Sequence, residues 1–434
     1  MKAPAALSGP DGRWWRIAVT ALLLVLAVLI TRLQMANYFA QHGSAGSEAA
    51  IQTALWWQAD HPVALEAKAK QRLALIGEDT PAPALLSEIT QLLQQALAAD
   101  PSRGTLAAML ALVTGDQNDS SATEYASLAN RLAPVEPRVQ RDLATFALRQ
   151  QDLAAAVVHM ARAMVGAPES AARYYPVLMQ VAADPQAREV LTAIAADPRP
   201  FPWWLGFFAH VAREADNLDA LRNLVTLREA SIAFPLQERE RNYYIDRLRR
   251  EGLVAEAYLH WANGLSREQL QSLGYLYDGS FEHEFANDAG FGWVVNPPRN
   301  SGIRVRAGDT YGASGDRALR LSFSGKRVRF SHIYQHLFLA PGSYSLVGRV
   351  RPEQLVARRG LQWRVYCVAG VSGTLGESEL FVGTGDWRRF ELAIDVPGDC
   401  SGQMLRLYSA GNREVDHELD GAIWFDDLEI RLQK

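Results

Sequence analysis

The sequence predicts a multidomain α plus β protein with a single transmembrane helix, an α-helical hairpin-repeat solenoid and a C-terminal antiparallel β-sandwich. Three observations support this fold class. An uncharged apolar segment lies close to the N-terminus, at residues 17–30. Prolines then recur at a regular interval through the middle of the chain. From residue 274 onward, glycine and aromatic residues replace helix formers, and apolar residues alternate with polar ones.

The apolar segment 17–30 predicts a membrane anchor over residues 14–35. It contains no charge, glycine or proline, although it is shorter than the ~20 residues that a span needs. Trp14 and Trp15 at its start suit the headgroup layer, and the arginines at its two ends can reach that layer by snorkelling. A cleaved signal peptide is the alternative. It is disfavoured because no good small-x-small cleavage site follows soon after the segment.

Charges in front of the anchor predict its orientation. Three basic residues precede the apolar segment and only one acidic residue opposes them, which leaves the N-terminus in the cytoplasm. The composition, rich in alanine and arginine, is typical of a GC-rich bacterial genome. We therefore expect a single-pass protein of the bacterial inner membrane with the bulk of its chain in the periplasm. Residues 1–13 are expected to be a disordered cytoplasmic tail, and residues 36–47 a linker.

Composition and motifs exclude several classes of function. The formal net charge of -4 gives no support for a nucleic-acid partner. The sequence contains no phosphate loop, no Gly-x-Ser-x-Gly elbow and no His-Glu-x-x-His motif. Acidic residues gather between 414 and 420, but their spacing is more typical of a solvated loop than of paired glycosidase carboxylates. We therefore predict no catalytic residue and no enzymatic activity, and a carbohydrate-active enzyme is the least favoured interpretation.

Residues 48–273 are predicted to form a helical domain, because apolar residues recur there at three- and four-residue spacing. Prolines recur at intervals of 33 or 34 residues: Pro101, Pro134, Pro168, Pro202 and Pro235. Such an interval accommodates two helices and two turns, the unit of a helical solenoid. These arrays usually bind protein segments on their concave face. We therefore expect cell-envelope or polysaccharide-export proteins as partners.

Small residues keep a fixed distance from two of these prolines. Alanines lie five and twelve residues before Pro134 and before Pro168: Ala122, Ala129, Ala156 and Ala163. Small side chains at these places let the two helices of a hairpin approach closely, and the pattern resembles the tetratricopeptide repeat. The resemblance covers about residues 63–270. It departs from the family because the aromatic and glycine of the first helix are mostly missing and Asp197 stands where the family has alanine. The resemblance implies helical hairpins and names no partner.

Residues 274–434 are predicted to form the β-sandwich. The alternation is clearest in five segments, the last of which breaks its period once: 317–323, 344–350, 361–367, 390–396 and 423–430. Eight or nine short strands separated by turn residues are typical of a β-sandwich. Cys367 and Cys400 both fall in this domain, on the oxidising side of the membrane if the topology holds. This placement favours a disulfide between them over two buried thiols.

Five sequence features of this domain resemble the jelly-roll carbohydrate-binding modules of the galactose-binding-like class. They are, in order, 278–282 with 290–293, then 315–321, 339–346, 387–390 and 425–430. The resemblance implies a jelly-roll fold, which serves sugar binding in some proteins and a structural role in others. It also implies a structural Ca²⁺, with Glu282 and Asp426 or Asp427 as candidate ligands, since hard oxygen ligands suit this ion. The alternative is that the two aspartates face solvent and a turn. No other cofactor is predicted.

The outward phase of the predicted strands carries arginine and aromatic residues. The candidates are Tyr334, His336, Arg349, Arg351, Arg364, Tyr366, Arg406 and Tyr408. Arginine forks bind carboxylates through two hydrogen bonds, and aromatic rings stack on sugar faces. If these strands are neighbours, they form one face that suits an acidic polysaccharide. The alternatives are a solvated face or one packed on the helices. Four tryptophans are instead predicted to lie in the core: Trp293, Trp363, Trp387 and Trp424.

Together these features predict a membrane-anchored extracytoplasmic scaffold with a glycan-binding β-sandwich, acting in exopolysaccharide or cell-envelope assembly. The helical repeats would hold protein partners and the sandwich would contact glycan. The alternative function is a pure protein–protein assembly scaffold whose sandwich is structural and binds no sugar.

Overall fold

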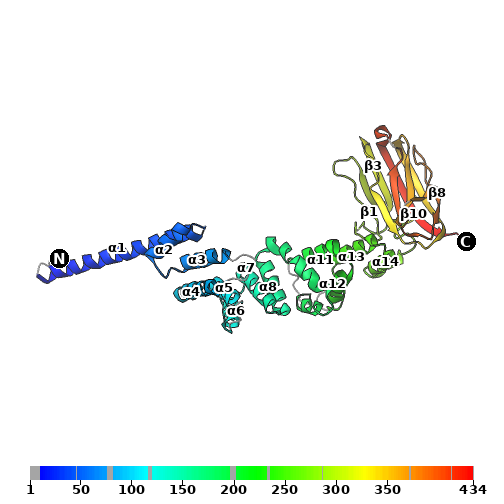
Figure 1. Ribbon diagram of the computed structural model, residues 1–434. Coiled ribbons are helices and arrows are strands. Elements are labelled where there is room, and N and C mark those ends of the chain that lie inside the picture. The colour runs from blue at the N-terminus through cyan, green and yellow to red at the C-terminus, as the bar shows by residue number, and fades with distance from the viewer. Residues whose placement is uncertain are drawn as a thin grey trace, which may run out of the picture. The chain divides into compact units, whose positions relative to one another are not determined.

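A computed structural model describes residues 10–44, 46–75, 82–115, 120–195, 202–231, 235–285, 287–370, 373–411 and 413–433 (Figure 1). The chain forms two compact units, residues 1–204 and 205–434. The architecture is the predicted α plus β one, with a long apolar N-terminal helix, further helices and a C-terminal antiparallel β-sandwich. Each unit is described by itself below.

The first unit begins with α1 (Pro10–Ser44), which contains the predicted anchor. Its apolar stretch is long enough to cross a membrane and is not buried against protein. The helix does not end at the predicted boundary, because it continues through Ser44. Most of the segment 36–47 is therefore helical where we expected a linker, and Ala36 and Ala40 are buried. The helix also starts at Pro10, inside the predicted tail; residues 1–9 lie outside the described part of the chain.

The remaining helices of the first unit follow in short succession. They are α2 (Glu48–Trp57), α3 (Pro62–Ala74), α4 (Pro83–Ala99), α5 (Gly104–Gly115), α6 (Ser121–Leu132), α7 (Pro137–Arg149), α8 (Leu153–Gly166), η1 (Pro168–Arg173), α9 (Tyr175–Ala183), η2 (Arg188–Leu191) and α10 (Thr192–Ala195). Helices α5 and α6 pack on each other, and so do α7 and α8. The predicted prolines fall where expected, since Pro134 follows α6 and Pro168 follows α8.

Small residues allow these helices to pack closely. Ala129 and Ala163 are almost completely buried. A Cβ atom added to Gly104, the first residue of α5, would lie 2.7 Å from the Cβ of Ala133 at the end of α6. The stretch from Pro168 to Ala195 is less regular, with two 3-10 helices between short α-helices. This irregularity lies in the part of the sequence that departed most from the repeat pattern; Asp197 itself lies outside the described residues.

The second unit contains five helices in its described part and then the sandwich. The helices are α11 (Trp204–Glu214), which begins at the boundary, α12 (Asp219–Glu229), α13 (Glu238–Arg250), α14 (Val254–Ala262) and α15 (Arg267–Gln271). Helix α14 packs on the sandwich through aromatic rings. Tyr258 lies 5.6 Å from Phe338, and Trp261 lies 5.6 Å from Phe291, measured between ring centroids. Gly290 leaves room for the Trp261 ring, which any Cβ there would meet at 1.9 Å.

The described strands form two five-stranded antiparallel sheets. Sheet A has the order β1 (Val294–Val295), β4 (Ile333–Leu337), β9 (Cys400–Ser409), β6 (Leu361–Gly370) and β7 (Gly373–Glu377). Sheet B has the order β2 (Arg304–Gly308), β3 (Ala318–Arg327), β10 (Glu418–Leu432), β5 (Gly342–Ala357) and β8 (Arg388–Val396). A short 3-10 helix, η3 (Glu414–His417), precedes β10.

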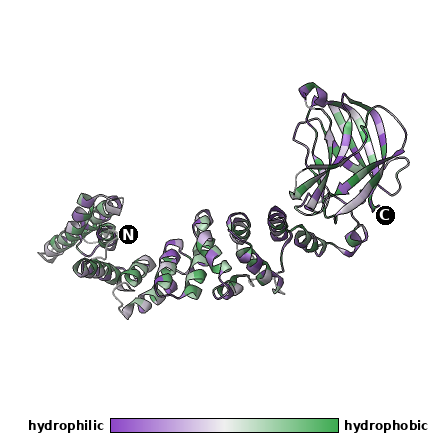
Figure 2. Cartoon of the chain, turned by 45° about the vertical axis from the view of Figure 1, so that its right-hand side comes forward, coloured by the Kyte–Doolittle hydropathy of each residue, from purple (hydrophilic) through white to green (hydrophobic). Residues whose placement is uncertain are grey.

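The core of the sandwich lies between the inward faces of the two sheets. Apolar and polar residues alternate along the strands, as the two colours of Figure 2 show, because successive side chains of a strand point to opposite faces. Trp293 and Trp363 lie in this core with Phe425, as predicted for the two tryptophans. Trp424 and Trp387 do not belong to it. Both lie on the outer face of sheet B, and the reason is described below.

Candidate functional site

Three neighbouring strands of sheet A bring six of the eight predicted residues together. Strand β4 contributes Tyr334 and His336, β9 contributes Arg406 and Tyr408, and β6 contributes Arg364 and Tyr366. Arg406 stands directly opposite Tyr334 on one side and Arg364 on the other. Residues that pair across antiparallel strands have adjacent side chains on the same face. The outer face of sheet A therefore combines two guanidinium groups with three phenol rings.

The arginines of this face stack on the tyrosines. The Arg364 guanidinium lies 4.2 Å from the ring centroid of Tyr408 and 5.4 Å from that of Tyr366. It also forms an ion pair with Glu377 at the end of β7. Burial raises the pKa of Tyr408 to about 12, so its hydroxyl stays protonated at neutral pH. This half of the face therefore holds one arginine with a carboxylate partner and two half-buried tyrosines.

Arg406 differs from Arg364 in its partners. Its guanidinium lies 4.9 Å from the ring centroid of Tyr334. Among the residues that the structure describes, no carboxylate lies within ion-pair distance of it, and its Nε is buried without a hydrogen-bond partner. A buried donor without a partner carries a free-energy cost of about 1–3 kcal/mol. Arg406 is therefore a cation that lacks a bound counterpart within the described chain.

Helix α13 covers one end of this face. A hollow of about 230 Å³ lies there between α13 and sheet A, and its lining includes Arg249 and His336. Burial, and then the charges of Arg249 and Arg406, lower the pKa of His336 to about 3. The imidazole is therefore neutral at physiological pH. Arg249 forms one hydrogen bond to Asp246 at 3.3 Å, but its Nε and Nη1 are buried without a partner in the described residues.

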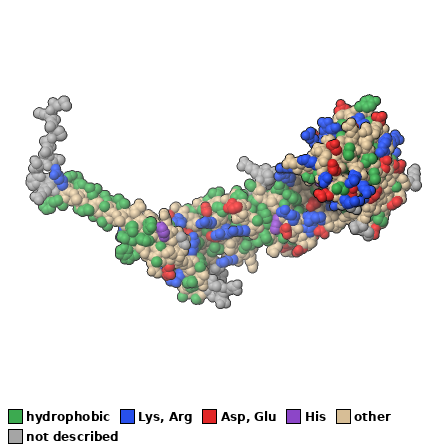
Figure 3. Space-filling model, turned by 90° about the horizontal axis from the view of Figure 1, so that it is seen from above, with side chains coloured by type: hydrophobic (Ala, Val, Ile, Leu, Met, Phe, Trp, Pro, Cys, Tyr) green, Lys and Arg blue, Asp and Glu red, His purple; other side chains and the backbone are tan. Residues whose placement is uncertain are grey.

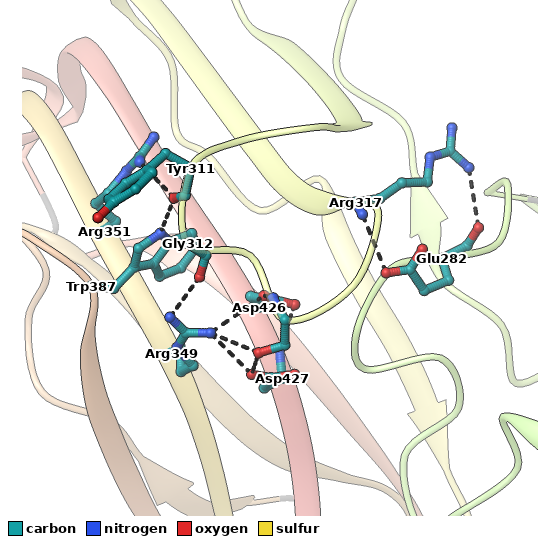
Figure 4. Close-up of polar contacts among 10 residues, drawn as sticks. Glu282, Tyr311, Gly312, Arg317, Arg349, Arg351, Trp387, Asp426 and Asp427 are labelled. Atoms are coloured by element: carbon teal, nitrogen blue, oxygen red, sulfur yellow. Dashed lines mark hydrogen bonds and ion pairs between the residues drawn. The ribbon is translucent and has the colours of Figure 1, made fainter.

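The other two predicted residues do not join this face. Arg349 and Arg351 lie on β5 of sheet B and face away from sheet A, so the single face of eight residues is not formed. Arg349 donates to the carbonyl of Gly312 at 2.7 Å and lies 3.4 Å from the Asp427 carboxylate (Figure 4). Arg351 donates to Glu353 at 2.7 Å. Both guanidinium groups are already occupied by groups of the protein.

Two tryptophans that were predicted to lie in the core instead stack on arginines of sheet B. The rings of Trp387 and Trp424 lie on its outer face between arginines. Arg349 and Arg351 lie 4.9 and 5.4 Å from the Trp387 centroid, and Arg351 also lies 5.2 Å from that of Trp424. The Trp387 indole donates to the carbonyl of Tyr311 at 2.7 Å, which ties a loop over the sheet (Figure 4). The arginines on the outer face of sheet B are thus paired with carboxylates or carbonyls of the protein, although Arg351 Nε and Trp424 Nε1 are buried without a hydrogen-bond partner in the described chain.

The residues predicted to hold Ca²⁺ are not gathered in one place. Glu282 accepts a hydrogen bond from the amide of Arg317 at 3.2 Å, whereas Asp426 accepts one from the amide of Ser314 at 2.8 Å. Figure 4 shows Glu282 apart from the two aspartates. No cluster of three or more His, Cys, Asp or Glu suited to a metal occurs in the described chain. Their present partners therefore do not fit a calcium site.

Asp426 is not a solvent-facing turn residue either. It is completely buried, and burial together with the Asp427 charge raises its pKa, which the amide hydrogen bond from Ser314 partly offsets. Arg349 is the cation nearest to it, with Nη1 at 3.9 Å.

The predicted cysteine pair is joined in the structure: Cys367 and Cys400 form a disulfide with a Cα–Cα distance of 5.8 Å.

Sequence reasoning missed two residues of the face, Glu377 and Arg249, and placed Gln362 on it correctly. Glu377 pairs with Arg364 across the edge of sheet A, and Gln362 lies beside Tyr408. Arg249 reaches the face from a helix. No local pattern distinguishes Arg249 from its neighbours on α13, because the arginines at 247, 249 and 250 all fit an ordinary charged helix. The period of the β-strands predicted Gln362 on this face, because it shares the outward phase of Arg364.

No family model matches the chain, and no curated protein matches it. Solved structures similar to the C-terminal sandwich include a CBM4 structure, at 15% identity and a TM-score of 0.27, covering 36% of this chain and 99% of that one. TmCBM61 in complex with beta-1,4-galactotriose shares 16% identity over 37% of this chain and 100% of that one, with a TM-score of 0.25.

A third similar structure is the CBM22-1 xylan-binding domain of a Paenibacillus barcinonensis protein. It shares 16% identity over 36% of this chain and 92% of that one, with a TM-score of 0.25. At these identities the likenesses concern the fold alone. They assign no role to any residue, and they leave the tetratricopeptide-repeat resemblance of the helical hairpins as a prediction.

Proposed function

We propose that the outer face of sheet A binds an acidic glycan, and that the chain is a non-enzymatic, membrane-anchored scaffold of exopolysaccharide or cell-envelope assembly. The observation that carries the proposal is Arg406. Its half-buried guanidinium lies over Tyr334 and has no carboxylate partner among the described residues. A sugar carboxylate placed there would accept the charge-assisted hydrogen bonds that the protein itself leaves unmade.

The residues around Arg406 suit the apolar face and the hydroxyl groups of a sugar. Tyr334, Tyr366 and Tyr408 surround it with aromatic surface on which apolar sugar faces stack. The tyrosine hydroxyls can exchange hydrogen bonds with sugar hydroxyls, and the buried Gln362 positions one of them by accepting a hydrogen bond from Tyr408. Arg249, with two donor nitrogens free of partners in the described chain, extends the positive charge to the end of the face. The arrangement supports recognition by charge and stacking, and it contains no paired carboxylates for hydrolysis.

The anchor is proposed to be retained rather than cleaved. The C-terminal half of α1 belongs to the core of the first unit, since Ala40 packs with Ala54 and Ala64. His61 at the start of α3 also lies 2.9 Å from the side chain of Asn37, between Nε2 and Oδ1. Cleavage between Ala40 and Ser44 would remove both contacts. This supports an uncleaved inner-membrane anchor, with the charge bias placing the bulk of the chain in the periplasm.

The helical pairs of the first unit supply the scaffold part of the proposal. A hollow of about 460 Å³ lies along α7, α8 and η1, and three arginines are among its lining residues: Arg138, Arg141 and Arg173. A groove with this lining suits a protein segment of envelope or polysaccharide-export partners, as expected of repeat arrays. Tetratricopeptide-like hairpins remain our interpretation of these helices.

The glycan proposal is tested with the full chain in detergent micelles. Polygalacturonate and its carboxyl-reduced counterpart differ only in the sugar acid, so they isolate the charge-dependent part of binding. We expect retention on the acidic polymer that weakens with salt, because exposed charges are screened. Equal retention on both polymers would show that the sugar carboxylate does not contribute to binding, which contradicts the role proposed for Arg406. No retention on either at low salt would favour the alternative function, a protein scaffold with a structural sandwich.

A further inference from the structure

Helix α1 consists of two halves with different surroundings. From Trp14 to Leu33 its apolar side chains are exposed, and they cover the helix in Figure 3. Burial begins two residues later, at Met35 and Ala36, where other helices of the unit pack against it. The boundary between the lipid-suited half and the protein-packed half therefore lies at residues 33–36.

Helix α2 returns along the second half of α1 toward this boundary. The close approach of the two helices starts at Gly43, where any Cβ would lie 2.6 Å from the side chain of Ile51. It continues through the contact of Ala40 with Ala54. The residue numbers of the contacts increase along α2, from 51 to 54, as they decrease along α1, from 43 to 40. The two helices are therefore antiparallel. The C-terminal end of α2 is therefore carried back to the level of the boundary.

Two polar contacts fix this end of α2 against α1. Arg32 donates from Nε to the carbonyl of Trp57, the last residue of α2. Carbonyls at a helix C-terminus lack intrahelical partners and favour a nearby cation. Beyond the turn, His61 contacts the side chain of Asn37. These two contacts place the turn 58–61 beside residues 32–37 of α1.

This placement puts exposed tryptophan at the boundary. The Trp56 side chain is 75% exposed, and its ring packs edge-on against that of Trp57 with centroids 4.8 Å apart. At the other end of the apolar stretch, Trp14 and Trp15 are also exposed. Seventeen residues separate Trp15 from Arg32, which is about 26 Å of α-helix. The hydrocarbon layer of a bilayer is about 30 Å thick.

We propose that the turn between α2 and α3, with Trp56 and Trp57, lies in the headgroup layer of the membrane that α1 spans. Trp56, Trp57 and Arg32 would lie at one membrane interface. Trp14 and Trp15 would lie at the opposite interface. Tryptophan is suited to this layer because its ring is apolar while its N–H remains hydrogen-bonded. The inference rests on the membrane anchorage proposed above. It adds a lipid-contacting surface outside the spanning helix.

The test places a nitroxide label at Ala59→Cys, an exposed position in the turn that leaves both tryptophans intact. The native cysteines are bonded to each other and do not react without reductant. The full chain is inserted into vesicles of phosphatidylethanolamine and phosphatidylglycerol. Collisions with oxygen, which concentrates in lipid, are compared with collisions with a water-soluble nickel chelate. We expect the label to be shielded from nickel and reached by oxygen.

The matched control is Val135→Cys, a 78% exposed position in the turn between α6 and α7, which should remain nickel-accessible. Trp56→Ser should increase nickel access at position 59 several-fold, whereas Trp56→Tyr should preserve the shielding. A label at 59 as nickel-accessible as at 135, in protein that floats with the vesicles, would overturn the inference and leave the anchor intact. Protein that does not float would overturn the anchorage, and this inference with it.

Discussion

Replacing Arg406 by alanine tests the candidate glycan site most directly. The guanidinium has no ion-pair partner among the described residues, so its removal leaves no protein carboxylate uncompensated. The lost stacking on Tyr334, at 4.9 Å, should reduce stability by about 0.5–1 kcal/mol. A hydrogen bond between charged groups contributes about 1.5–3 kcal/mol, so affinity for an acidic glycan should fall about 10- to 150-fold. Arg406→Lys should fall between, because lysine cannot make the planar two-point contact.

Arg349→Ala is the matched comparison on the opposite sheet. This guanidinium is the cation nearest to the fully buried Asp426 and donates to the carbonyl of Gly312. Its loss leaves the buried Asp426 with the amide hydrogen bonds from Ser314 and Asp427 but without its nearest cation, so stability should fall by more than in Arg406→Ala. Glycan affinity should stay unchanged, contrary to the sequence-based expectation that Arg349 belongs to the binding face.

Isothermal titration with polygalacturonate fragments and chemical denaturation measure the two effects separately. We predict a crossed pattern, in which Arg406→Ala loses affinity and at most about 1 kcal/mol of stability, while Arg349→Ala loses more stability and keeps its affinity. If both variants bind with the affinity of the parent protein, Arg406 of sheet A does not recognise the carboxylate of the glycan. If Arg349→Ala alone loses affinity while remaining folded, the binding face lies on sheet B.

Three further predictions follow. Replacing Cys367 and Cys400 by serine should lower the free energy of unfolding of the sandwich by about 2–4 kcal/mol, and mass spectrometry without reductant should show the two peptides linked; free thiols would contradict this. Because the pKa of His336 is lowered to about 3 in the folded chain, its contribution to stability is complete above about pH 6.5 and is lost as the pH falls from there toward 3. The variant His336→Gln should flatten this part of a stability–pH curve, and an unchanged slope would show that the imidazole is not buried neutral. A periplasm-active reporter fused after Lys434 should be active, and a cytoplasm-active one inactive, unless the predicted topology is wrong.

The sequence predicts the layers of the sandwich well because strand alternation reports directly on burial. Trp363 and Val365 lie in the core with Arg364 between them on the outer face, as predicted, whereas the prediction of a core position failed for Trp424. The single break in period near the C-terminus also has a structural cause. Strand β10 shifts register after Asp426, and Asp427 adopts a φ of 51°. A bulge of this kind reverses the phase that simple alternation would assign.

Alternation does not say which sheet a strand joins. Arg351 and Arg364 have the same outward phase in sequence, yet β5 and β6 belong to different sheets. The side chains therefore point away from each other on opposite sides of the sandwich. Strand pairing depends on long-range hydrogen bonds, and a local pattern contains no information on them. For this reason the eight predicted residues divide between sheet A, where Arg406 has no carboxylate partner among the described residues, and sheet B, where both arginines form ion pairs.

Local composition also failed at the predicted linker. Gly43 and the small residues around it are typical of a flexible connection, but α1 and α2 lie so close there that a Cβ at Gly43 would be 2.6 Å from the Ile51 side chain. Glycine allows the two helices to lie close together here, in the half of α1 against which α2 and α3 pack. Tertiary packing thus overrides a local preference, as it often does for helix boundaries.

The continuity of α1 has a mechanical consequence for the first unit. Helices bend sharply at proline, at glycine or where the hydrogen-bond ladder is interrupted. Between Ile30 and Ala40 the sequence TRLQMANYFA contains neither proline nor glycine, and the structure is helical throughout. The lipid-suited half of α1 is therefore joined to the protein-packed half without a hinge. Contacts of Arg32 and Asn37 with the α2–α3 turn then fix that turn at the level where the helix leaves the apolar stretch. In the proposed anchorage, the orientation of this unit relative to the bilayer would follow from the tilt of one helix, rather than from the free rotation that a linker would allow.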